Sequence, residues 1–122
     1  MATIRYLVNE VEASIEFYTT HLGFALLEQM GPAFAIVSRG DLHLWLSGPQ
    51  TSAARPMPDG RKPEPGGWNR LVIEVEDIET LAASMKSAGV LFRNDIIAGP
   101  GGRQILAEDP SGNPIEIFRP AS

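Results

Sequence analysis

Two stretches of the chain repeat one pattern, and this internal repeat constrains the fold more than any other feature. Residues 4–24 and residues 71–90 correspond at an offset of 67 positions, so that Val8 falls on Val75. Each copy has a short alternating stretch typical of a strand, then acidic residues at a helix start, then an amphipathic helix closed by glycine, followed by further strands. A duplicated unit of this kind usually buries one shared face, and the cleft between the copies is the expected place for a site.

The length of 122 residues is that of one ordinary domain, so the two modules must cooperate within a chain or between chains. The net charge of -5 and the lack of a basic run argue against a nucleic-acid or anionic-membrane partner. The absence of cysteine excludes disulfides, thiolate nucleophiles and Cys-based zinc sites. Neither a signal peptide nor an apolar run of roughly 18 residues is present, so we expect a soluble, cytoplasmic protein.

The predicted secondary structure is the same in both halves of the chain. The helix of the first half ends at Gly23, and the helix of the second half runs through Ala88. The predicted strands cover residues 3–8, 24–28, 33–38 and 42–47, then 70–75, 91–93, 104–108 and 114–118. The last two are expected to form a hairpin, because Asp109 to Asn113 suits a type I turn with glycine at a positive φ. The pattern predicts an α+β fold in which two βαβββ modules form curved mixed sheets around a shared cleft.

The expected domain organisation is a single domain over residues 1–122, with module one at 1–47, a linker at 48–67 and module two at 68–122. Five of the ten prolines fall in the linker. Such a segment is either a passive tether or a lid over the cleft. Trp68, directly after it, either anchors the returning chain or flanks the mouth of the cleft.

Two motifs carry a resemblance to a known family. Glu16-Phe17-Tyr18 precedes Leu22-Gly23-Phe24 in the first copy, and the second copy contains Glu-Asp-Pro-Ser-Gly-Asn-Pro-Ile-Glu at 108–116. Together with the repeated βαβββ pattern, they closely resemble the vicinal oxygen chelate superfamily, which holds glyoxalase I, bleomycin-resistance proteins, fosfomycin-resistance transferases and extradiol dioxygenases. The resemblance covers nearly the whole chain and implies the fold. It says little about function, because this fold hosts unrelated activities.

In metal-binding members, the resemblance implies ligands near the start of the first strand and on the last strand of each module. These places correspond to Thr3 and Trp45 in module one and to Arg70 and Glu116 in module two. Only Glu116 is an ordinary metal ligand, since Trp offers no ligand atom and Arg carries a permanent positive charge. One carboxylate does not hold a divalent ion. We therefore expect the superfamily fold without a metal and without another cofactor.

Strand alternation places further side chains on the same side as these four positions. Arg70 is expected to form a bidentate pair with Glu116 in the space that a metal would fill, either as a structural ion pair or as part of a ligand site. The candidate ligand-binding residues are Thr3, Arg5, Trp45, Arg70, Val72 and Phe118.

One functional hypothesis is a binding protein. Trp45 and Phe118 would stack on a small planar or anionic organic molecule in a metal-free cleft, while Arg5 or Arg70 holds its anionic or carbonyl end.

The alternative is a lyase, an isomerase or a dioxygenase-type enzyme of the same superfamily. It would be metal-independent, with Glu116 or His43 as general base. It could instead use a divergent metal site in which Asp41 or Glu74 joins His43 and Glu116. Related two-module chains commonly pair, so we also expect a homodimer, which the linker would allow in swapped or unswapped form.

Overall fold

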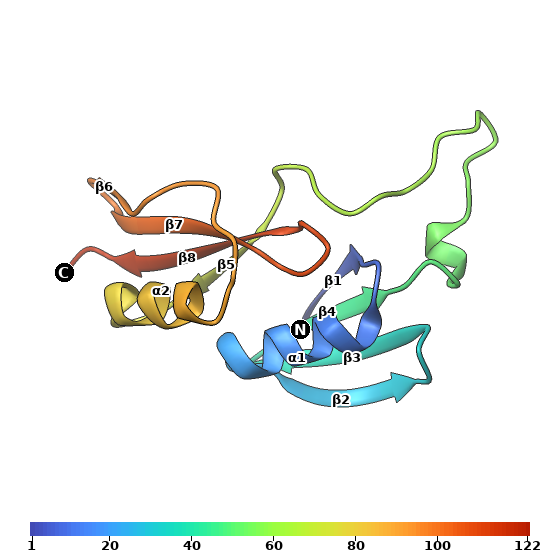
Figure 1. Ribbon diagram of the computed structural model, residues 1–122, viewed down its shortest axis with the longest axis horizontal. Coiled ribbons are helices and arrows are strands. Elements are labelled where there is room, and N and C mark those ends of the chain that lie inside the picture. Colours follow the sequence, from blue (N-terminus) through green and yellow to red (C-terminus); the bar gives the residue numbers. More distant parts are fainter. The chain divides into compact units, whose positions relative to one another are not determined.

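The computed structural model describes residues 1–122, and the chain divides into two compact units, residues 1–66 and residues 67–122 (Figure 1).

Unit one contains one helix and four strands. They are β1 (Ala2–Leu7), α1 (Val11–His21), β2 (Ala25–Met30), β3 (Phe34–Arg39) and β4 (Leu42–Ser47). The sheet order is β1-β4-β3-β2, with β1 parallel to β4 and the other pairs antiparallel. A short 3₁₀ helix, η1 (Ser52–Ala54), follows in the proline-rich segment.

Unit two repeats this topology. Its elements are β5 (Leu71–Glu74), α2 (Ile78–Ser87), β6 (Ile97–Gly99), β7 (Gly102–Glu108) and β8 (Pro114–Pro120). The sheet order is β5-β8-β7-β6, with β5 parallel to β8. The predicted α+β fold of two βαβββ modules is therefore confirmed.

The two helices begin and end where the sequence patterns predict, within a few residues. α1 is followed by Gly23 at a φ of 71°, a left-handed conformation that favours glycine. α2 is capped by Asp77, whose Oδ1 accepts from the Thr80 backbone N–H at 3.1 Å and whose Oδ2 accepts from the Thr80 hydroxyl at 2.7 Å. The hydroxyl bond lowers the pKa of Asp77, so this cap contributes at neutral pH and is lost as the pH falls through that lowered pKa. Neither helix is long and apolar enough to cross a membrane.

Each sheet buries one face under its own helix. Alternate residues on the inner strands of each sheet are almost completely buried, among them Val37 and Leu44 in unit one and Ile105 and Ile117 in unit two. The intervening side chains lie on the opposite face, which we call the open face of each unit. Open face one carries Thr3, Arg5, Phe34, Ile36, His43, Trp45 and Ser47, and open face two carries Val72, Gln104, Leu106, Glu108, Glu116 and Phe118.

The structure corrects one predicted strand. Residues 91–93 form only an isolated bridge, between Phe92 and Ala107, and the edge strand of unit two is β6. Its three residues are too few to show alternation in the sequence. The glycine-rich stretch after it closes the tight turn between β6 and β7, with Gly99 paired to Gly102.

The turn into β7 yields a stability prediction. Gly102 has a φ of 145°, and a Cβ there would overlap the backbone carbonyl of Arg119 on β8. Gly102→Ala should therefore lower the free energy of unfolding by about 1–3 kcal/mol. The matched control is Gly101→Ala, where a Cβ meets nothing within 4 Å, and thermal unfolding compares the two. Equal unfolding temperatures would contradict this account of the turn.

Candidate functional site

Glu116 lies at the centre of open face two. It belongs to β8, which is paired on both sides, and the residue is only 9% exposed. Arg70, directly before β5, donates to Glu116 Oε1 from Nε at 3.1 Å and from Nη2 at 2.9 Å. A carboxylate so far removed from water needs charged or hydrogen-bonding partners, and Arg70 supplies both.

Gln104 on β7 supplies the remaining partner of this carboxylate. With its amide nitrogen turned toward Glu116, it donates to Oε2 at 2.7 Å and to Oε1 at 3.1 Å. The expected pair between Arg70 and Glu116 is present, but it is not the expected two-oxygen fork. Both Arg70 nitrogens bind Oε1, which also accepts from Gln104, and Oε2 accepts from Gln104 alone. We call these three residues the Glu116 network.

Open face one presents an aromatic pair with a cation above it. Arg5 on β1 faces Trp45 on β4 in register, and its guanidinium carbon lies 4.8 Å from the indole centroid. Its Nη1 also donates to Ser47 Oγ at 3.3 Å. The Phe34 ring stands edge-on to Trp45 at 5.8 Å between centroids. The half-buried His43 lies on the same face, beside Thr3.

The proline-rich segment forms a concave surface within unit one. A cavity of about 350 Å³ lies between this segment and the end of β1. The residues around it are Leu7, Val8, Asn9, Pro49, Ala54, Pro56, Lys62, Pro63, Glu64 and Pro65. The segment thus adds one basic, one acidic and several apolar side chains to this cavity, and its role as a lid stays a prediction.

The structure gathers the predicted site residues into two groups. Thr3, Arg5, His43 and Trp45 share open face one. Val72, Glu116 and Phe118 share open face two, where Arg70 reaches Glu116. The roles assigned to these residues, and the shared cleft expected from the repeat, stay predictions.

The residues at the superfamily's ligand places do not fit a divalent metal. Thr3 and Trp45 form no donor set in unit one, and in unit two the carboxylate of Glu116 is occupied by a permanent cation and an amide. Neither unit contains a group of three or more His, Asp or Glu side chains that could hold a metal ion.

Sequence reasoning missed Gln104 as a partner of Glu116. The predicted hairpin contained the necessary signal. Once the turn at Asp109 to Asn113 sets the register, Leu106 faces Glu116 and Gln104 lies one pleat further on the same face.

Comparison with known proteins identifies the family. Residues 1–117 match the family described as the Glyoxalase/Bleomycin resistance protein/Dioxygenase superfamily. The chain therefore belongs to this superfamily, which confirms the resemblance to vicinal oxygen chelate proteins. Among curated proteins, none matches the sequence.

Several solved structures are similar over nearly the whole chain. TnmS3, an antibiotic binding protein from Streptomyces sp. CB03234, is 26% identical with a TM-score of 0.73, over 98% of this chain and 93% of that one. A superfamily member from Sphaerobacter thermophilus is 25% identical with a TM-score of 0.75, over 98% and 95% of the two chains. One from Nocardioides is 26% identical with a TM-score of 0.72, over 99% and 83%.

The Glu116 network predicts an uneven response to the loss of arginines. Arg70→Ala leaves a nearly buried carboxylate without its cation, so the free energy of unfolding should fall by about 1–3 kcal/mol. Arg103→Ala is the matched control, because Arg103 and its partner Glu79 are 42% and 51% exposed, and exposed pairs contribute about 0–1 kcal/mol. Urea unfolding of both variants tests this, and a larger loss for Arg103→Ala would contradict it.

Proposed function

We propose that this protein binds a small organic molecule, planar or with an anionic end, through the open faces of its units and without a metal ion. The observation that carries the proposal is the Glu116 network. The one acidic residue at the superfamily's ligand places is already paired with the cation of Arg70 and hydrogen-bonded by the amide of Gln104.

Open face one supplies a surface for the planar part of a ligand. The Trp45 ring is half-buried and braced by Phe34, which limits the conformational entropy lost on binding. The guanidinium of Arg5 over that ring offers charge to a carboxylate or carbonyl group.

Open face two places charge beside apolar side chains. Arg70 donates two hydrogen bonds to Glu116, at 3.1 and 2.9 Å, and one to the Trp68 carbonyl, at 3.3 Å. A guanidinium has five N–H donors, so the remaining donors are available to a ligand. Its side chain is 30% exposed. Val72, 52% exposed, and the half-buried Phe118 flank the network.

The similarity to an antibiotic binding protein supports binding rather than catalysis. The enzyme alternative needs a free base. Glu116 would have to break its bonds to Arg70 and Gln104 before taking a proton, which leaves His43, close to Trp45 on open face one, as the candidate.

Binding of aromatic carboxylates tests the proposal. Naphthalene-2-carboxylate, titrated in the presence of EDTA, should bind to the wild-type protein. Arg5→Ala should weaken binding at open face one, and Arg70→Ala binding at open face two, each by about tenfold or more, because a hydrogen bond to a charged group contributes about 1.5–3 kcal/mol. Calorimetry measures affinity, and mass spectrometry of the ligand detects turnover. The matched control is Arg61→Ala, since Arg61 is 83% exposed and pairs only with Asp59.

Two results would contradict the proposal. Ligand binding that requires a divalent ion would show that the site depends on a metal. If the wild type converts the ligand and His43→Asn binds the ligand without converting it, the result would favour the enzyme alternative.

We also infer a cytoplasmic homodimer. β2 is an edge strand, and it exposes Leu26, Leu27 and Met30 to 45%, 54% and 57%, which is an apolar surface suited to a partner subunit. Sedimentation equilibrium should give a dimer for the wild type. Leu27→Glu should shift it toward the monomer, whereas Leu91→Glu, at a leucine 69% exposed outside this strand, should not. A monomeric wild-type protein would contradict the inference.

A further inference from the structure

Trp68 is a large apolar side chain that is left in water. It is 68% exposed and is the only aromatic residue among the exposed large apolar side chains. Tryptophan is highly buried on average in folded proteins. An indole kept this exposed therefore calls for a reason beyond packing.

Arg93 holds the indole in place. Its guanidinium carbon lies 4.5 Å from the centroid of the Trp68 ring. The guanidinium is itself fixed by three bonds, from Nε to Glu108 Oε2 at 2.7 Å, from Nη1 to the Gly67 carbonyl at 2.7 Å and from Nη2 to the Gly112 carbonyl at 2.9 Å. The Arg93 side chain is only 17% exposed. One ring face of Trp68 thus rests on a rigid cation.

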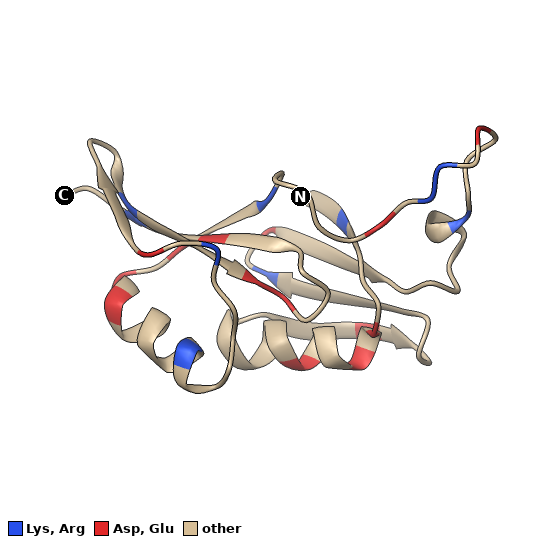
Figure 2. Ribbon diagram, turned by 45° about the horizontal axis from the view of Figure 1, so that its top comes forward, with Lys and Arg blue, Asp and Glu red and all other residues tan.

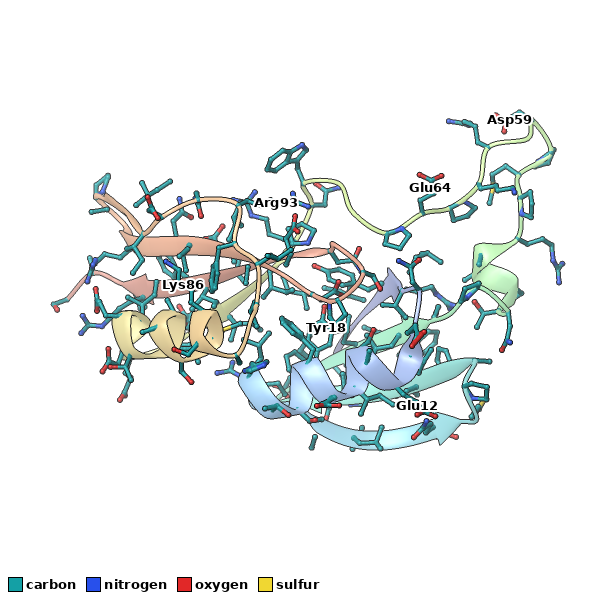
Figure 3. The ribbon with its side chains drawn as sticks, viewed as in Figure 1. Glu12, Tyr18, Asp59, Glu64, Lys86 and Arg93 are labelled. Atoms are coloured by element: carbon teal, nitrogen blue, oxygen red, sulfur yellow. The ribbon has the colours of Figure 1, made fainter.

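This arrangement borders open face two. Glu108 alternates with Gln104 and Leu106 on that face, and it binds Arg93. Figure 3 shows Arg93 on the segment between α2 and β6, beside the chain that enters β5. Arg70 in turn donates to the Trp68 carbonyl at 3.3 Å. This hydrogen bond joins Arg70 to the backbone of Trp68, two residues earlier, so the partly exposed guanidinium is held next to this residue at one edge of the sheet.

We propose that Trp68 is a ligand-stacking residue. The ring face turned away from Arg93 takes the planar part of an aromatic carboxylate, and Arg70 takes its carboxylate through the donors that Glu116 does not use. The inference rests on the proposed function, and it names the ligand class for open face two.

The contact with Arg93 anchors the returning chain through one ring face of Trp68, and it leaves the exposure of the rest of the indole unexplained. Arg93 reaches this segment through the Gly67 carbonyl, a backbone group that any residue at position 68 would leave in place. Holding one ring face on a fixed cation leaves the other rigid and available, which lowers the entropy lost on stacking.

Trp68→Ala tests the inference, with Trp68→Phe as the matched variant that keeps a stacking ring. Naphthalene-2-carboxylate should bind Trp68→Ala about tenfold or more weakly, because stacking of a planar group on an aromatic side chain contributes about 1–3 kcal/mol. Trp68→Phe should stay within about threefold of the wild type. Cyclohexanecarboxylate has the same charge without a planar ring, and its affinity should change little in either variant. The indole N–H signal of Trp45 in NMR spectra confirms that each variant is folded.

The outcomes separate this inference from the proposed function. Binding that Arg70→Ala weakens and Trp68→Ala leaves unchanged would overturn the role of Trp68 while the proposed function stands. A wild-type protein that does not bind naphthalene-2-carboxylate at millimolar concentrations would overturn both. Equal losses for the planar and the non-planar acid in Trp68→Ala would also reject stacking.

Discussion

The structure depends most on how a nearly buried carboxylate is neutralised. A single helix covers one face of each sheet. The side chains on the other face of the central strands have no helix over them, and on β8 one of these side chains is Glu116. Its charge draws in Arg70 from the start of β5 and Gln104 from β7, so that side chains from both sides of β8 converge on one group. Loss of Arg70 would leave this charge without a counter-ion in a site that water barely reaches, and loss of Gln104 would leave Oε2 without its hydrogen-bond donor.

The same place in the other unit is filled by different chemistry. Trp45 on β4 corresponds to Glu116 on β8, and each receives an arginine from its own unit. In unit one the contact is a cation over a ring, and in unit two it is an ion pair with an added amide. Basic and acidic residues are interspersed over both units rather than gathered by sign (Figure 2). The two copies of one fold therefore carry different chemistry at corresponding positions, a planar ring under a cation in unit one and a paired carboxylate in unit two.

Local sequence patterns predicted the features that depend on neighbouring residues. They did not predict contacts between residues that lie far apart in the sequence. The repeat, alternation and turn glycines led to the topology and to the hairpin of β7 and β8, whereas the pairing of Arg70 with Glu116 was expected from the resemblance to the superfamily, whose ligand places these two residues occupy. The strand β6 was missed because its pairing depends on a tight glycine turn rather than on a hydrophobic pattern. Arg93 donates to the backbone carbonyls of Gly67 and Gly112. Every residue has a backbone carbonyl, so the amino-acid sequence does not indicate which carbonyls accept these bonds.

The metal content of the protein tests the central claim most directly. Protein purified without chelators should be dialysed against Zn²⁺, Ni²⁺ and Mn²⁺ in turn, returned to metal-free buffer and analysed by plasma mass spectrometry. Because Glu116 is bound by Arg70 and Gln104, the account predicts far less than about one ion per chain. About one retained ion per chain, lost in Glu116→Gln, would show that this carboxylate binds a metal and would contradict the account.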